Sequence, residues 1–275
     1  MDDLDFTGTA RSVLYDPGIA RKCFESFGKL EKAGAGEAIF AEGDDSDKMY
    51  LLTEGEVMLS RGRKSLDIVK AGEVFGEMAA ISRQPRSANA VARTACIALS
   101  LDSRQFRKAI ESAPEFALML MSIMITRLRM TMARLKLTKT LPDLNHSDES
   151  RVFDRRLLDE LSKSFKGRQP QTVPAGHVIM KEGEGGVFMY VVMQGRIAVS
   201  VQKTVVEHIG QGGVFGEMAI LDQSSRAATA TAEIPSMLLS INRNEFLSLI
   251  RENSEFAVSL LTAITERLRG MTPQR

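Results

Sequence analysis

The sequence predicts an α+β protein made of two tandem domains, each an antiparallel β-roll or jelly-roll barrel with flanking helices. The chain matches itself without gaps when Gly76 is placed on Gly216, a shift of 140 positions. Solenoid repeats have periods of roughly 20 to 50 residues, so this period indicates a duplicated domain. Each copy also changes from strand-like to helix-like patterning along its length, which favours an α+β fold.

The repeat is clearest at residues 74–79 and 214–219, which both read Val-Phe-Gly-Glu-Met-Ala. The joint between the copies is expected in residues 138–150, where apolar periodicity lapses and Pro, Asn, Ser and Asp accumulate. The predicted domains are therefore residues 1–139 and residues 140–275.

The first part of each copy carries short β-prone runs separated by glycine turns. In the first copy the runs are residues 49–52, 57–59 and 96–99, and the turns contain Gly43, Gly55 and Gly62. Many short strands with turn signals at 8 to 12 residue spacing are typical of an antiparallel barrel or jelly roll.

After about Asp102 the pattern becomes helical. A heptad-like seam of apolar residues, spaced by three and four, comprises Leu118, Met121, Ile125, Leu128, Met132 and Leu135. The equivalent helix of the second copy has a weaker seam, with Thr265 and Thr272 at two of its positions. We expect the Leu118–Leu135 helix to pack against its twin in a homodimer or against the second domain.

Composition excludes several classes of protein. Hydrophobic residues make up 44% and charged residues 26%, so each half can build a core. The net charge of +1 gives no whole-chain basic field for nucleic acid. The longest apolar run, residues 116–125, is about half the roughly 20 residues needed for a membrane span. An acidic N-terminus is unlike a secretion signal, and Cys23 and Cys96 are expected to be reduced thiols of a cytoplasmic protein.

Catalytic and metal motifs are not found. His146, His177 and His208 share no metal-ligand spacing, and no Ser-His-Asp, Walker or dinucleotide motif is recognised. The sequence therefore predicts a binding protein rather than an enzyme, with no catalytic residues and no metal.

One segment of each copy has the residue types of an anion site. A glycine permits close approach of the backbone to a ligand, and the first turn of a short helix after it offers free N–H groups. An arginine nine residues after the glutamate supplies a planar fork suited to phosphate, while the glutamate can accept from a ribose hydroxyl. The candidate residues are Gly76, Glu77, Met78, Ala79, Arg86 and Ser87 in the first copy, and Gly216, Glu217, Met218, Ala219, Arg226 and Ala227 in the second.

These segments read F-G-E-M-A-A-I-S-R-Q-P-R-S-A and F-G-E-M-A-I-L-D-Q-S-S-R-A-A. They resemble the phosphate-binding cassette of cyclic-nucleotide-binding domains, roughly F-G-E-x-A-L-x-x-x-x-P-R-x-A, with Ser225 in place of the proline in the second copy. This family includes the bacterial catabolite activator protein, the regulatory subunits of cAMP-dependent protein kinase and cyclic-nucleotide-gated channels. The resemblance covers nearly the whole chain.

The resemblance implies roles for matching positions. Glu77 and Glu217 would hold the ribose 2′-hydroxyl. Arg86 and Arg226 would neutralise the cyclic phosphate, aided by amides near Ala79 and Ala219 and by Ser87. Thr131 falls where the activator protein contacts the base with a threonine, whereas the second copy has Met271 there. Ala227 is typical of a cAMP site, and Ser87 leaves cGMP possible in the first domain.

The function implied is that of a cAMP sensor that signals through a protein effector by helix rearrangement. A transcription regulator is disfavoured, because the sequence ends at Arg275 without a helix-turn-helix. A kinase inhibitor is disfavoured too: about fifteen residues precede the first helix, and residues 10–13 resemble a basic inhibitor motif only faintly. A free-standing bacterial-style cAMP receptor is favoured, and a ligand-independent scaffold is the third alternative.

Overall fold

The computed structural model describes residues 16–141, 149–165 and 167–271. It divides into two compact units, Met1–Ile123 and Met124–Arg275, so the division falls inside one long helix. The domain boundary predicted between residues 139 and 140 marks the start of the second sequence repeat, and it stays a prediction. His146, residues 10–13, Thr272 and the middle of the expected joint lie outside the described residues.

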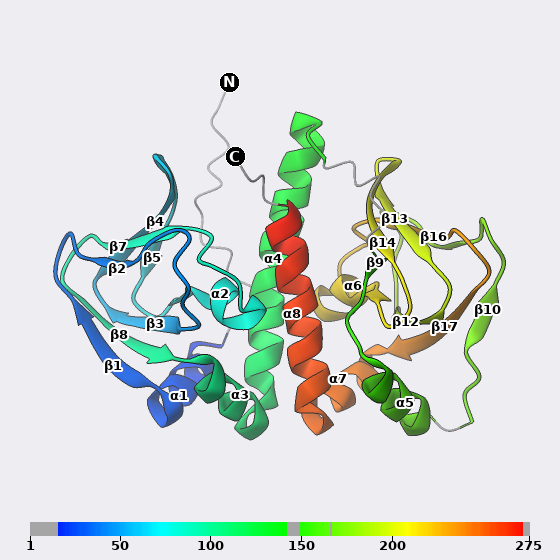
Figure 1. Ribbon diagram of the computed structural model, residues 1–275, viewed down its shortest axis with the longest axis horizontal. Helices are drawn as coiled ribbons and strands as arrows, with labels where there is room; N and C mark the ends of the chain where they lie inside the picture. The colour runs from blue at the N-terminus through cyan, green and yellow to red at the C-terminus, as the bar shows by residue number, and fades with distance from the viewer. Residues whose placement is uncertain (1–15, 142–148, 166, 272–275) are drawn as a thin grey trace. The chain divides into compact units, whose positions relative to one another are not determined.

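The first unit contains two four-stranded antiparallel sheets, in the orders β1–β8–β3–β6 and β2–β7–β4–β5 (Figure 1). Helices α1 and α3 contact each other, and both contact β8. The elements are α1 (Pro17–Phe27), β1 (Lys29–Ala33), β2 (Ala38–Phe40), β3 (Met49–Glu54), β4 (Glu56–Arg61), β5 (Lys64–Lys70), β6 (Val74–Phe75), α2 (Glu77–Ser82), β7 (Asn89–Ala92), β8 (Cys96–Leu101), α3 (Ser103–Ser112) and the start of α4 (Pro114–Thr138).

The second unit repeats this arrangement, with sheet orders β10–β17–β12–β15 and β11–β16–β13–β14–β9. All its pairings are antiparallel except the short parallel pairing of β9 with β14. The elements are β9 (Glu149–Ser150), α5 (Arg155–Ser164), β10 (Gln171–Val173), β11 (Val178–Met180), β12 (Phe188–Gln194), β13 (Ile197–Val201), β14 (Thr204–Ile209), β15 (Val214–Phe215), α6 (Glu217–Asp222), β16 (Thr229–Ala232), β17 (Ser236–Asn242), α7 (Arg243–Glu252) and α8 (Ser254–Met271).

The α+β prediction of two antiparallel rolls with helices is confirmed, and so are its main elements. The expected β-runs form β3, β4 and β8. The change to helical pattern after Asp102 occurs because the Asp102 carboxylate accepts from the N–H groups of Arg104 and Gln105, closing a capping box. In the core of the first roll, the rings of Phe40, Tyr50 and Phe75 stack with centroids 5.0 to 6.2 Å apart.

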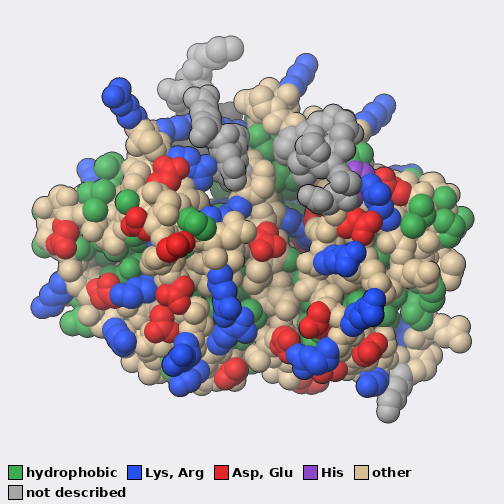
Figure 2. Space-filling view, in the orientation of Figure 1, with side chains coloured by type: hydrophobic (Ala, Val, Ile, Leu, Met, Phe, Trp, Pro, Cys, Tyr) green, Lys and Arg blue, Asp and Glu red, His purple; other side chains and the backbone are tan. Residues whose placement is uncertain are grey.

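Helix α4 is longer and more apolar than the sequence pattern suggested. By length and composition it meets the criteria for a membrane span, with a mean hydropathy of 1.4. However, 61% of that window is buried inside the protein, as in the core helix of a globular protein. Figure 2 shows basic and acidic side chains interspersed on the visible face, consistent with the net charge of +1.

Both cysteines are buried free thiols. Cys23 is 2% exposed on α1, and burial raises the pKa of its thiol to about 11. Because the thiolate is the reactive form, Cys23 is an inert core residue near neutral pH.

Glu31 on β1 links two strands of the first roll and makes stability depend on pH. Its carboxylate accepts from Lys48 Nζ and Ser100 Oγ, both at 2.7 Å. Burial acts to raise the pKa of Glu31, but these two hydrogen bonds and the positive charges of Lys48 and Lys29 together outweigh it and hold the pKa below its ordinary value. A carboxylate with a depressed folded pKa stabilises the fold above its unfolded pKa, and this is lost as pH falls.

We therefore expect the free energy of unfolding to fall as the pH drops below about 5, partly through Glu31. In urea unfolding Glu31→Gln should be less stable than wild type at pH 7, and the difference should shrink as the pH falls below the ordinary glutamate pKa. Glu54→Gln, which replaces an exposed glutamate, is the control and should unfold close to wild type at pH 7. A difference between Glu31→Gln and wild type that does not shrink as the pH falls would contradict this account.

Candidate functional site

The turn between β6 and α2 places the first cassette. Gly76 has φ +70°, a left-handed conformation that L side chains rarely adopt. A Cβ at this position would lie 2.8 Å from Arg86 Nη1 and 3.1 Å from the Phe40 ring. Only glycine therefore allows the backbone to lie against the arginine. Gly216 is equivalent, with φ +83°, and a Cβ there would lie 2.6 Å from Arg226 Nη1.

Arg86 is 3% exposed and is held by backbone and hydroxyl oxygens. Nη1 donates to Gly76 O at 2.7 Å, and Nη2 donates to Ser46 Oγ and Lys48 O, both at 2.7 Å. The guanidinium also lies 4.0 Å from the centre of the Phe40 ring, a cation–π contact. Its Nε is buried and has no hydrogen-bond partner among the described residues.

Arg226 occupies the same place in the second unit with a different surround. It is 5% exposed, and it donates from Nη1 to Gly216 O at 2.8 Å and from Nη2 to Phe188 O at 2.6 Å. In place of Ser46 the second copy has Gly186, where a Cβ would lie 2.0 Å from Arg226 Nε. In place of Phe40 it has Met180. The two arginines therefore donate to equivalent backbone carbonyls, and they differ in the Ser46 hydroxyl and the Phe40 ring that contact Arg86 alone.

These buried cations have no carboxylate at ion-pair distance among the described residues. Burial lowers the pKa of both Arg86 and Arg226, and neighbouring charged groups only partly offset it. Buried charges are normally paired because their desolvation is costly. Each arginine is therefore suited to receive an anion.

The two oxygens of the Glu217 carboxylate differ in their hydrogen bonding. Glu217 is 2% exposed, and its Oε1 accepts from Arg267 Nη1 at 2.8 Å. Its Oε2 is buried and has no hydrogen-bond partner among the described residues. A buried acceptor without a donor is expensive, so this oxygen fits a ligand hydroxyl.

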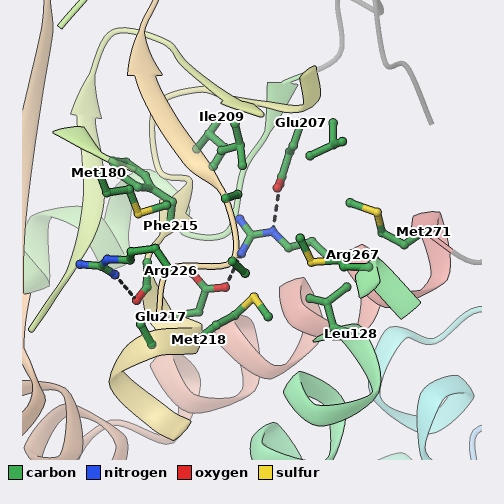
Figure 3. A pocket seen from close by; sticks show the side chains of 17 residues that line it. Leu128, Met180, Glu207, Ile209, Phe215, Glu217, Met218, Arg226, Arg267 and Met271 are labelled. Carbon is green, nitrogen blue, oxygen red and sulfur yellow. Dashed lines mark hydrogen bonds and ion pairs between the residues drawn. The ribbon is translucent and has the colours of Figure 1, made fainter. Parts of the chain in front are cut away.

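Arg267 of α8 lies between two carboxylates, as Figure 3 shows. Nε donates to Glu207 of β14 at 3.0 Å, and Nη2 donates to the carbonyl of Val214. Burial acts to lower the pKa of Arg267, but Glu207 and Glu217 outweigh it and raise the pKa above its ordinary value. The arginine thus ties α8 to both the roll and the second cassette.

The second unit holds a pocket that opens to solvent. Its lining includes every candidate of the second cassette together with apolar residues of the strands and two helices. The residues are Leu128, Met132, Met180, Val199, Val206, Glu207, Ile209, Phe215, Gly216, Glu217, Met218, Ala219, Arg226, Ala227, Ala228, Arg267 and Met271.

The structure brings most sequence-predicted residues together. In the first unit Gly76, Glu77, Met78 and Ala79 lie on or beside α2, and Ser87 Oγ lies 3.9 Å from the Met78 sulfur. Thr131 belongs to the second compact unit, so its role as a base contact of the first site stays a prediction. Met271 occupies the position in the second copy that matches Thr131, and the sequence left open whether a methionine there contacts the base. In the structure Met271 lines the second pocket.

Sequence reasoning missed several residues of the site, among them Arg267, Glu207, Leu128 and Met132. Arg267 was visible as part of the repeat, since residues 127–129 match residues 267–269 as Arg-Leu-Arg. Leu128 and Met132 were visible only as seam positions. Glu207 matches Asp67 in the first copy, and nothing in the sequence connects it with an arginine sixty residues away.

The profile of the family described as "Cyclic nucleotide-binding domain" matches residues 30–113 and 170–253. A cAMP-dependent protein kinase regulatory subunit of Yarrowia lipolytica is 29% identical over 80% of this chain and 53% of its own length. The cGMP-dependent protein kinase egl-4 of Caenorhabditis briggsae is 27% identical over 80% of this chain and 27% of its own. This chain thus spans about half and about a quarter of those two relatives.

Among solved structures, the regulatory domain of Toxoplasma gondii PKA with cAMP is 21% identical, with a TM-score of 0.32. The match covers 86% of this chain and 87% of that one. Independently of it, the two family matches together cover more than half of this chain, one in each repeat. The chain therefore belongs to the cyclic nucleotide-binding domain family and contains two copies of the domain.

Proposed function

We propose that this protein is a cAMP-binding regulatory protein with two nucleotide sites, and that it is not an enzyme. The observation that carries the proposal is the pair of buried arginines, Arg86 and Arg226, for which the described part of the chain offers no carboxylate at ion-pair distance. A cyclic phosphate supplies the missing negative charge, and Glu217 Oε2 accepts from the ribose 2′-hydroxyl. Glu77, Ser87 and the first-turn amides near Ala79 and Ala219 have the roles that the family resemblance implies.

Ligand binding is proposed to act on helix α8 through Arg267. The guanidinium bonds Glu217, whose other oxygen receives the ribose, so the nucleotide and the helix share one carboxylate. A protein effector would then distinguish loaded from empty protein by the state of this helix. The regulatory subunit among the relatives supports such a role. A cytoplasmic location and a homodimer through residues 118–135 also stay predictions.

Isothermal titration of nucleotide-stripped protein with cAMP, and then with cGMP, tests the proposal. We expect two cAMP per chain at micromolar or tighter affinity, with 5′-AMP as the control that lacks the cyclic phosphate. One cAMP per chain would mean that one copy has become structural. No binding of either cyclic nucleotide would contradict the sensor function and favour a ligand-independent scaffold.

A further inference from the structure

Strand β9 attaches the end of the expected joint to the second roll. It is two residues long and pairs in parallel with β14, with Glu149 beside His208 and Ser150 beside Ile209 (Figure 1). The N–H of Gly210 donates to the carbonyl of Ser150 at 3.3 Å. A pairing this short has few backbone hydrogen bonds, and each of them contributes little net stability in water. The side-chain contacts of Glu149 therefore matter for how firmly β9 is held.

His208, one of the paired residues, is surrounded by charged side chains. Its own side chain is 10% exposed, and its Nδ1 lies 2.9 Å from Glu233 Oε2 and 3.3 Å from Arg196 Nη2. Arg196 Nε lies 2.7 Å from the same Glu233 oxygen and 3.9 Å from Glu149 Oε1. Arg151 Nη2 lies 3.8 Å from Glu149 Oε2. We call these five residues the His208 cluster.

A single ring nitrogen does not satisfy both neighbours of His208 at once. Nδ1 with a proton donates to Glu233, and Nδ1 without a proton accepts from Arg196. Charging the ring strengthens its contact with Glu233 and places a positive charge 3.3 Å from the Arg196 guanidinium, which repels it. Among the described residues, Glu149 is the other carboxylate within 4 Å of that guanidinium. It is therefore the partner to which Arg196 turns.

Other charged groups on this strand lie on its opposite face. Glu207 precedes His208 on β14, and its carboxylate pairs with Arg267. Successive residues of a strand point to opposite faces of the sheet. The charges that face His208 in the described part of the chain are therefore those of Arg196, Glu233 and Glu149, with Arg151 bound to Glu149.

The first repeat has the same ion pair without a titrating partner. Arg196 and Glu233 match Glu56 and Arg93, where the charges are exchanged and Arg93 Nη1 lies 3.0 Å from Glu56 Oε2. His208 matches Ile68. Histidine is the side chain that commonly changes charge between pH 5 and pH 8, and isoleucine has no charge to change. The two repeats therefore differ at this place in their response to protons.

We propose that the His208 cluster is a proton-dependent switch that sets how firmly β9 is held on the second roll. Near pH 8 the ring is neutral, and Arg196 binds Glu233. Near pH 5.5 the ring has taken up one proton from solvent, Glu233 binds the ring, and Arg196 binds Glu149. The end of the joint is then held more tightly. This inference does not depend on nucleotide binding.

Double-mutant cycles in the full chain test the exchange of partners at pH 8 and pH 5.5. One cycle combines Arg196→Gln with Glu149→Gln, the other combines Arg196→Gln with Glu233→Gln, and each is measured by urea unfolding. On acidification we expect the Arg196–Glu149 coupling to rise by about two- to three-fold in the unfolding equilibrium constant, and the Arg196–Glu233 coupling to fall by a similar factor.

Two controls assign this pH dependence to the histidine. His208→Ile installs the residue of the first repeat and should make both couplings independent of pH. The matched cycle of Glu56→Gln with Arg93→Gln should give the same coupling at both pH values. Couplings that do not change with pH in the wild-type background would overturn the proposal. So would a pH dependence that persists in His208→Ile.

NMR of the unaltered chain provides a test that needs no variant to fold. The ring carbons of His208 report its charge, and the hydrogen-exchange protection of the Gly210 amide reports the pairing of β9. Between pH 8 and pH 5.5 the ring should titrate, and protection corrected for intrinsic exchange should rise by about two- to three-fold with it. A ring that keeps its charge over this interval, or protection that does not rise as the ring titrates, would refute the switch.

Discussion

Replacing Arg226 with alanine is expected to remove one of two cAMP equivalents per chain, and replacing Arg86 to remove the other. Each arginine is at least 95% buried, so the phosphate it receives lies in a poorly solvated place. Truncating one member of a buried charge pair costs about 2–5 kcal/mol, or at least ~30-fold in affinity. Isothermal titration measures both stoichiometry and affinity.

Two controls define what the loss means. Arg93→Ala removes an arginine whose ion pair with Glu56 is exposed, and it should bind two cAMP with wild-type affinity. Arg226→Lys keeps the charge but loses the planar fork, so it should bind more weakly than wild type and more tightly than Arg226→Ala. Two sites of normal affinity in Arg226→Ala would show that the phosphate binds elsewhere.

Removing Arg267 is expected to destabilise the second unit more than removing any surface arginine. Its side chain is 13% exposed and bridges Glu207 and Glu217, which are 17% and 3% exposed. Arg267→Ala leaves two adjacent carboxylates without their shared cation. Breaking a buried ion pair in this way costs about 3 kcal/mol. Urea unfolding should show a lower midpoint for the second unit.

A compensating variant tests the cause of that loss. Adding Glu207→Gln to Arg267→Ala removes one of the two stranded charges and should recover part of the stability. Arg156→Ala, which breaks exposed pairs with Glu160 and Glu255, should leave unfolding nearly unchanged. If Arg267→Ala unfolds like wild type, or if Glu207→Gln recovers nothing, the carboxylate-bridging role is refuted.

The repeat and the cassette could be predicted because they are local in sequence. Glu217 and Arg226 lie nine residues apart on one short helix and the loop after it, so a single segment brings them together. Likewise, strand and helix boundaries follow from turns and caps such as Asp102, whose partners are two and three residues away. Such short-range geometry is encoded by residue type and spacing.

The sequence alone determined the family, the duplication and the two arginine–glutamate cassettes. Only the tertiary structure decided how each cassette is surrounded. It brings Arg267 to Glu217 from fifty residues away, and it places Leu128 of α4 at a pocket built by the second repeat. It also shows that Ser46 and Gly186, one repeat apart, give their arginines different surroundings. These contacts join elements that are distant in the chain, so they depend on the packing and charge pairing of the whole fold. An apolar residue such as Leu128 can pack against any apolar neighbour, and its residue type therefore does not specify which one it contacts.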